Sequence, residues 1–186
     1  MHMKNILPIL TLTTLAAAAS AQSAAAPAGL SYNRVSVSRA GQENNLAVSQ
    51  LLGSSNVLLG LSNRSYETTY GTGTTDYGNY TFLSVGYVFK NVAAGVDATV
   101  YLGAGNEFNN STVGVNLRRS LSEVFAGLEV ALGHERTEGT AGNASASSWT
   151  YELAYNINKQ FQLAYGITDT KTATEDRHTV SVRYNF

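Results

Sequence analysis

The chain ends in RHTVSVRYNF, residues 177–186, and this stretch decides the fold class. Successive side chains of an extended strand point to opposite faces. One face of this strand is therefore wholly apolar and the other wholly polar, and they consist respectively of Val180, Val182, Tyr184 and Phe186, and of Thr179, Ser181, Arg183 and Asn185. The pattern predicts a strand that separates an apolar environment from a polar one.

The composition also points away from an ordinary soluble domain. The 186 residues suit one domain, but only 13% of them are charged, against about 25% in soluble domains. These charges are too few to cover a water-facing surface. The net charge of −1 argues against nucleic acid as a partner. The absence of cysteine excludes disulfides and cysteine metal sites.

The N-terminus reads as an export signal. Lys4 precedes the apolar run 6–15, and Ala19-Ser20-Ala21 matches the small-residue cleavage pattern. We therefore expect residues 1–21 to be a signal peptide, 22–28 a flexible leader, and 29–186 the mature domain. A transmembrane helix needs about 20 apolar residues. No stretch after Gln22 is apolar enough, so any insertion into a membrane must use strands.

From residue 29 onward, segments of alternating polarity are separated by polar breaks, as in transmembrane barrels. The predicted strands are 29–39, 44–52, 56–66, 79–89, 93–103, 111–119, 124–134, 148–156, 160–168 and 177–186. They predict an all-β fold, a single antiparallel up-and-down transmembrane β-barrel of ten strands. Short breaks alternate with longer ones, near 67–78, 104–110, 135–147 and 169–176, which places the short turns in the periplasm and the longer loops outside the cell. Residues 40–43 would be an unusually short outer loop, and without that first hairpin the barrel has eight strands.

Each predicted strand has one apolar face, which we expect to contact lipid. Examples on four strands are Leu83, Val85, Tyr87 and Phe89; Ala94, Val96, Val100 and Leu102; Ala126, Leu128 and Val130; and Trp149, Tyr151 and Leu153. Aromatic residues gather at the strand ends, which predicts two belts at the lipid headgroup levels. The belt near the short turns comprises Phe89, Tyr155, Phe161, Tyr184 and Phe186, and the belt near the loops comprises Tyr66, Tyr80 and Trp149.

The terminal pattern of Val180, Val182, Tyr184 and Phe186 resembles the closing strand of bacterial outer-membrane β-barrels. In that family it is the assembly signal read by the barrel-assembly machinery. As an architecture, the whole mature chain resembles the small barrels related to the membrane domain of outer-membrane protein A and its porin-like relatives. The resemblance implies an outer-membrane location, with membrane lipid and lipopolysaccharide around the barrel. It implies no oligomeric state.

Charged residues on the inward face predict an ionic layer inside the barrel, made of Arg34, Arg64, Asp97, Arg118, Glu129, Glu152 and Arg183. Buried charges persist when they are paired. The spacing brings Asp97 and Arg118 within about a residue of opposite on consecutive strands, so we expect them to pair. Barrels this small are largely filled by side chains. We therefore expect a plugged lumen and a structural or surface-interaction role, with a narrow porin-like channel as the alternative.

The outer rim gives two further hypotheses. Acidic residues outnumber basic ones in the predicted loops, and Arg39, Arg64 and Arg177 are candidates for direct contact with lipopolysaccharide phosphates. His134 and His178 also lie near the rim, but on strands that are not neighbours. An outer-membrane enzyme is therefore only a third alternative, and we predict no catalytic, cofactor-binding or metal-binding residues.

Overall fold

The computed structural model describes residues 30–69, 75–105, 108–139, 145–171, 173 and 175–186. The predicted signal peptide and leader lie outside the described residues. The strands are β1 (Arg34–Ala40), β2 (Glu43–Leu51), β3 (Val57–Thr69), β4 (Thr75–Ala93), β5 (Val96–Gly105), β6 (Asn110–Ser120), β7 (Leu128–Gly139), β8 (Ala146–Asn156), β9 (Phe161–Thr170) and β10 (Arg177–Asn185). Within the described part, no helix is long and apolar enough to cross a membrane.

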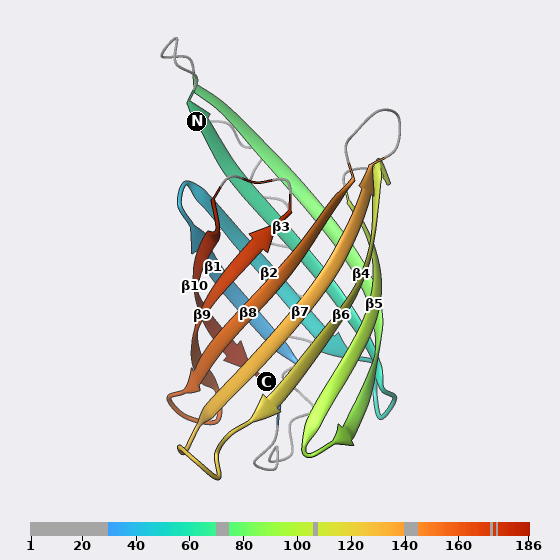
Figure 1. Ribbon diagram of the computed structural model, residues 1–186, viewed down its shortest axis with the longest axis vertical. Helices are drawn as coiled ribbons and strands as arrows, with labels where there is room; N and C mark the ends of the chain where they lie inside the picture. The colour runs from blue at the N-terminus through green and yellow to red at the C-terminus, as the bar shows by residue number, and fades with distance from the viewer. Residues whose placement is uncertain (1–29, 70–74, 106–107, 140–144, 172, 174) are drawn as a thin grey trace.

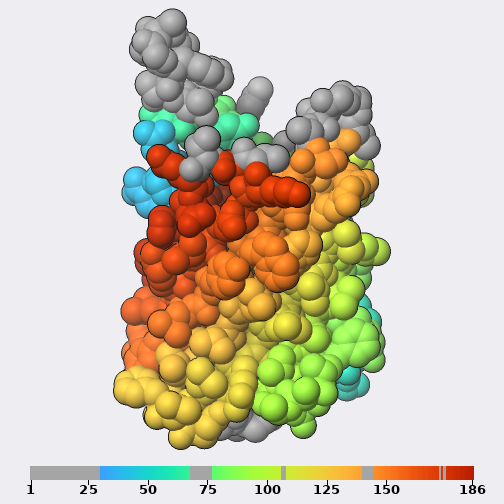
Figure 2. Space-filling model, in the orientation of Figure 1, coloured from blue at the N-terminus to red at the C-terminus, as the bar shows by residue number. Residues whose placement is uncertain are grey.

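The ten strands form one closed antiparallel barrel in which each strand pairs with its neighbours in the chain. β1 closes the ring by pairing with both β2 and β10, so that Val37 lies opposite Leu46 on one side and Val182 on the other. Closure leaves no strand edge with unpaired backbone groups. The predicted ten-strand up-and-down barrel is confirmed, and the first hairpin forms (Figure 1). Figure 2 shows β7 to β10 as a continuous wall of side chains.

The alternation predicted for the last strand is present in β10. Val180 and Val182 are 59% and 50% exposed, whereas Ser181 and Arg183 are 6% and 7% exposed. The same outward apolar face continues around the barrel on Leu83, Val85, Val100, Leu102, Tyr151, Leu153, Leu163 and Tyr165, all of which are exposed. An exposed apolar surface that runs around a closed barrel is what a lipid environment requires.

The two ends of the barrel differ. One end, here called the short-turn end, carries the connections β2–β3, β4–β5, β6–β7 and β8–β9. The other, here called the loop end, carries the remaining connections, and there β3 and β4 extend above the other strands (Figure 1). The β4–β5 turn is tight because Ala94 and Gly95 both have positive φ angles, 49° and 76°. Such angles match the twist of the flanking strands.

The strand boundaries differ from the sequence predictions most clearly in three regions. β1 begins at Arg34 rather than at residue 29, because residues 30–33 leave the sheet. Most of the predicted loop 67–78 instead continues the β3–β4 hairpin, where Glu67 lies opposite Tyr77. Residues 124–127 belong to the β6–β7 connection rather than to a strand, with backbone hydrogen bonds from Val124 and Phe125 to the carbonyl of Leu121. Ala126 is therefore not part of a lipid-facing strand.

Aromatic side chains concentrate on the outer surface at the short-turn end. The ring centroids of Phe161 and Tyr184 are 5.4 Å apart, and those of Phe125 and Tyr155 are 5.9 Å apart. At the loop end, Tyr80 departs from the predicted belt. Its hydroxyl donates to Asn110 Oδ1 at 2.6 Å, inside the barrel. The register explains this, since Tyr80 has the parity of inward-facing residues on β4.

Candidate functional site

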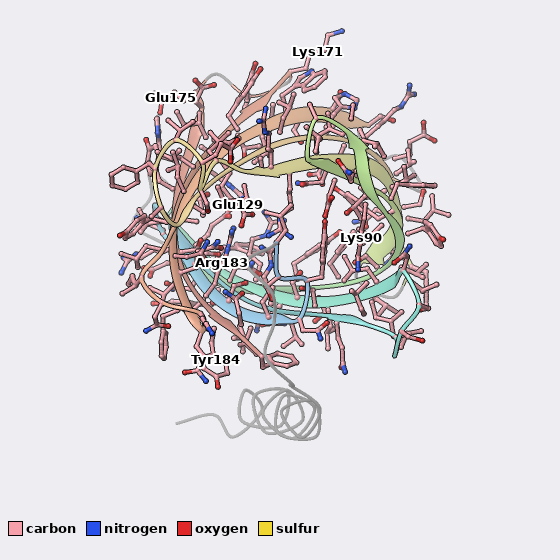
Figure 3. The ribbon with its side chains drawn as sticks, turned by 90° about the horizontal axis from the view of Figure 1, so that it is seen from below. Lys90, Glu129, Lys171, Glu175, Arg183 and Tyr184 are labelled. Carbon is pink, nitrogen blue, oxygen red and sulfur yellow. The ribbon has the colours of Figure 1, made fainter. Side chains whose placement is uncertain are left out.

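A hydrogen-bonded ionic network covers one wall of the lumen near the short-turn end. Arg118 on β6 pairs with Glu129 on β7, with Nη2 at 2.6 Å from Oε1, and Arg183 on β10 pairs with Glu152 on β8. Figure 3, seen from the short-turn end, shows Glu129 and Arg183 pointing into the ring and Tyr184 pointing away from it. Arg118 and Glu129 are only 5% and 2% exposed, so their charges are stable there chiefly because they are paired.

Gln162 on β9 joins the two ion pairs. Its Nε2 donates to Glu129 Oε2 at 3.1 Å, and its Oε1 accepts from Arg183 Nη1 at 3.0 Å. One amide thus gives a donor to the carboxylate of one pair and an acceptor to the guanidinium of the other. Sequence reasoning missed Gln162 because it counted only charged residues. The signal was its inward position on β9, directly opposite Arg183.

The predicted pair of Asp97 and Arg118 does not form. The two residues lie directly opposite each other on β5 and β6, as the spacing predicts. Arg118, however, turns toward Glu129, and Asp97 accepts hydrogen bonds from the Tyr32 hydroxyl at 2.7 Å and the Asn91 backbone N–H at 2.7 Å. Glu129 lies on the adjacent strand β7, two residues from the position opposite Arg118, and Asn91 lies on β4. Tyr32 comes from the segment before β1, which the spacing of adjacent strands does not reveal.

Tyr32 lies in residues 30–33, before the first strand. Burial, followed by the hydrogen bond to Asp97, raises the pKa of the Tyr32 phenol above its ordinary value. The phenol therefore stays protonated and acts as the donor. The Arg118 guanidinium stacks on the Tyr32 ring at 4.9 Å from the centroid.

Arg34, like Asp97, is a member of the predicted layer that has no ion-pair partner among the described residues. Its Nη1 is buried, and no hydrogen bond to it is made within the described part of the chain. Asn116 Oδ1 is also buried and has no hydrogen-bond partner in the described part of the chain. Both residues line the inner of two cavities in the lumen.

The inner cavity, of about 370 Å³, lies against β1 to β6. Its lining combines small and polar residues with apolar ones: Ser36, Ser49, Ser62, Ser84, Gly86, Thr99, Tyr101 and Asn116 lie beside Arg34 and Arg118, and Ala47, Val48, Leu58, Leu61 and Phe82 supply the apolar part. An outer cavity of about 390 Å³ lies above it, toward the loop end. The two share Ser62 and Phe82, which lie directly opposite each other on β3 and β4, so the cavities follow one another along the lumen.

Opposite charges line the outer cavity. Glu43 Oε2 pairs with Arg177 Nη1 at 2.9 Å and with Arg64 Nη1 at 3.5 Å. Glu135 was expected in an outer loop but lies in β7, where Oε2 accepts from the Tyr101 hydroxyl at 2.9 Å. Arg64 therefore belongs to this outer cavity, away from the network near the short turns.

Of the three arginines considered for lipopolysaccharide, Arg64 and Arg177 face the mouth of the lumen and contact Glu43. Arg39 instead has the parity of the outward face of β1 and is exposed, and its Nε donates to the Gly41 carbonyl at 3.1 Å. The lipopolysaccharide contact stays a prediction, and this geometry favours Arg39 for it.

The arrangement does not support the plugged lumen that the charge count suggested. The ionic network lies on β6 to β10, whereas the inner cavity lies against β1 to β6. Two ion pairs joined by one amide line a wall and leave the other side of the cross-section to the cavity. The sequence predicts a charged layer but does not say on which part of the circumference the charges gather.

The rim histidines form separate contacts. His134 Nε2 lies 3.0 Å from Ser147 Oγ, and its ring packs against Trp149, while His178 Nδ1 lies 2.6 Å from the Tyr165 hydroxyl. Among the described residues, no carboxylate contacts His134, so the serine and histidine lack the third group that orients the base in a triad. In the same part of the chain, no cluster of three His, Cys, Asp or Glu residues is arranged to hold a metal ion.

The chain resembles known proteins in fold and not in sequence. No protein-family model and no curated protein sequence matches the chain. The NanC porin structure is similar, with a TM-score of 0.52 and 10% identity over 82% of this chain and 98% of that one. The chain has the fold of a small bacterial outer-membrane β-barrel. This barrel is also similar to the KdgM porin in complex with disordered oligogalacturonate, at 14% identity over the same shares of both chains and a TM-score of 0.47. It spans 56% of the outer membrane channel DcaP of Acinetobacter baumannii, at 13% identity and a TM-score of 0.39.

Proposed function

We propose that the protein is a narrow porin-like channel of the outer membrane, through which ions and small polar solutes pass. The observation that carries this proposal is the pair of cavities that follow one another along the lumen, of about 390 and 370 Å³. Each has the size of a small-molecule site, about 300–1,000 Å³. A barrel whose only role is to anchor surface loops has no need for hollow space along its axis.

The chemistry of the lining supports passage. Polar groups such as Ser62, Thr99 and Asn116 can replace part of the hydration shell of a polar solute. Charges of both signs line the outer cavity, through Glu43, Arg64 and Arg177, so the mouth is polar without a strong field of one sign. The outward apolar face, the aromatic belt and the likeness to the NanC porin support a location in the outer membrane.

Single-channel recording in planar lipid bilayers tests the proposal. The refolded protein should give discrete conductance steps. Ser62→Trp places a large side chain where the two cavities meet and should reduce the step size. Leu83→Trp on the adjacent strand is the matched control, because Leu83 is 53% exposed on the outward face and the added ring would face lipid.

Two results would contradict the channel. If the protein inserts and no steps are seen in it or in variants that widen the lumen, the barrel does not conduct. If Ser62→Trp and Leu83→Trp change the steps equally, the current does not pass through these cavities. Gel mobility with and without heating confirms that each variant is folded before recording, because folded barrels of this type migrate differently from unfolded chains.

A further inference from the structure

The segment 30–33 crosses the lumen near the short-turn end. In the closed barrel, β1 and β6 lie five strands apart in either direction, so they are on opposite sides of the ring. Ten strands about 4.8 Å apart and tilted by about 40° give a backbone diameter of about 20 Å. The segment is joined to β1, yet it contacts side chains on β5 and β6. The chain must therefore leave the wall and pass inward.

Tyr32 makes the contacts with the far wall. Its hydroxyl donates to Asp97 Oδ2 on β5 at 2.7 Å, and its ring lies under the guanidinium of Arg118 on β6. Arg118 Nη1 also donates to the carbonyl of Ser31 at 2.9 Å. Arg118 thus contacts both this segment and Glu129, and it links the crossing chain to the ionic network.

The near side of the segment is held by backbone and amide contacts. The Ser49 hydroxyl donates to the Tyr32 carbonyl at 2.7 Å, and the Leu51 backbone N–H donates to Asn33 Oδ1 at 2.8 Å. The backbone N–H of Phe186 donates to the Asn33 carbonyl at 3.1 Å. These contacts join the crossing segment to β2 and to the end of the chain, next to the point where β1 begins.

Tyr32 forms part of the lining of the inner cavity, next to Arg34 and Arg118. Its side chain is among the most buried in the described residues, at 6% exposure. The cavity therefore ends toward the short turns on the Tyr32 ring and on the groups that hold it. Figure 3 looks into this end of the barrel and shows the start of the described chain, in blue, within the ring of strands.

We propose that residues 30–33 form the constriction of the channel and that Tyr32 is the residue that determines its conductance. This inference rests on the proposed channel function. The contacts divide into two groups with different consequences. Asn33 fixes the segment to the wall beside β1, whereas Tyr32 spans the opening to Asp97 and Arg118. Loss of the far contacts frees the Tyr32 side chain while the near attachment remains, so the constriction widens without loss of the barrel.

Single-channel recording of three variants tests the proposal. Tyr32→Ala removes the ring and should raise the conductance about twofold or more, because permeation depends on the diameter of the narrowest region. Tyr32→Phe keeps the ring and removes only the hydrogen bond to Asp97, so its main conductance should stay close to that of the unchanged protein, with more frequent brief openings to the higher level. Tyr151→Ala, on the outward face, is the matched control and should change neither.

A cysteine variant allows the bulk of the side chain at position 32 to be changed reversibly in the same protein. The chain has no cysteine, so Tyr32→Cys carries the only thiol. Its conductance should rise as in Tyr32→Ala and then fall when a bulky methanethiosulfonate reagent modifies the thiol. Restoration of the higher level by a reducing agent would show that the bulk at this position, and not a distortion of the barrel, sets the current.

The outcomes separate this inference from the function on which it rests. If the unchanged protein conducts and Tyr32→Ala conducts equally, the channel stands and the constriction is wrong. If neither conducts although both are folded, the channel proposal fails and the inference fails with it. If only the Tyr32 variants conduct, the inference is supported and the segment closes the channel at rest.

Discussion

Replacing Glu129 by glutamine should strongly destabilise the barrel. The substitution keeps the size of the side chain but removes its charge, so Arg118 loses its partner, whose Oε1 lies 2.6 Å from Nη2 and 2.8 Å from Nε. Both side chains are almost completely buried, at 6% and 3% side-chain exposure. The guanidinium of Arg118 is therefore poorly placed to recover its hydration.

The magnitude follows from this burial. Removal of one partner of a buried pair leaves an uncompensated charge, which typically costs about 3–5 kcal/mol. Removal of both partners leaves no uncompensated charge. We therefore expect the double variant Arg118→Gln with Glu129→Gln to recover much of the loss, with a coupling energy of at least about 1 kcal/mol. Arg118→Gln alone also breaks the hydrogen bond to Ser31, so it should be the more damaging single change.

Urea unfolding of the four proteins in lipid vesicles measures the coupling energy. The exposed ion pairs of Glu43 in the same barrel are the control. At the lumen mouth, Glu43 pairs with Arg64 at 3.5 Å and with Arg177 at 2.9 Å, and the three side chains are 33%, 34% and 45% exposed. Exposed pairs contribute about 0–1 kcal/mol. Glu43→Gln should therefore change the free energy of unfolding much less than Glu129→Gln.

A coupling energy near zero for Arg118 and Glu129 would refute this reasoning. It would mean that water reaches the short-turn end of the lumen freely and solvates the remaining charge. Equal losses for Glu129→Gln and Glu43→Gln would lead to the same conclusion, since burial would then have no effect on the energy of the pair.

Three other changes test the face assignments, the terminal signal and the packing inside the barrel. Val85→Arg places a charge on the lipid face and should cost about 2–4 kcal/mol, whereas Ser84→Arg on the same strand points into the inner cavity and should be milder in vesicle unfolding experiments. Deletion of Phe186 should leave the protein unassembled in cells, with loss of the heat-modifiable, protease-resistant band on gels. Gly103→Ala places a Cβ atom 2.1 Å from the Phe82 ring, so it should cost about 1–3 kcal/mol and should lower the conductance as the ring moves into the lumen.

Each of these changes has a control or a contradicting result. If Ser84→Arg is the more damaging of the two arginine variants, the inward and outward faces of β4 are reversed. Normal assembly without Phe186 would end the assembly-signal hypothesis. Gly133→Ala is the control for Gly103→Ala, because its nearest neighbour, Asn116 Nδ2, would lie at 3.4 Å. Equal destabilisation by both alanines would show that close approach of the aromatic ring is not the cause.

The sequence by itself determined the class of fold and most strand positions. Alternation is a local property, so Val180, Val182 and Tyr184 mark an outward face whatever the rest of the chain does. The lengths of the breaks also fixed which ends of the strands meet. Sequence reasoning was wrong at residues 124–127, where the apolar run Val-Phe-Ala-Gly suggests a strand but the backbone turns.

Only the tertiary structure decided which inward residues touch. Asp97 and Arg118 have the predicted register, yet Arg118 pairs with Glu129 and Asp97 binds Tyr32. Strand spacing fixes height along the barrel but not the direction in which a long side chain reaches across the lumen. Tyr32 and Asp97 are 65 positions apart in the chain. Their contact depends on closure of the ring, because only the closed barrel places the segment before β1 and the inward face of β5 around the same lumen. For the same reason, the cavities and the crossing segment at the short-turn end exist only in the closed barrel.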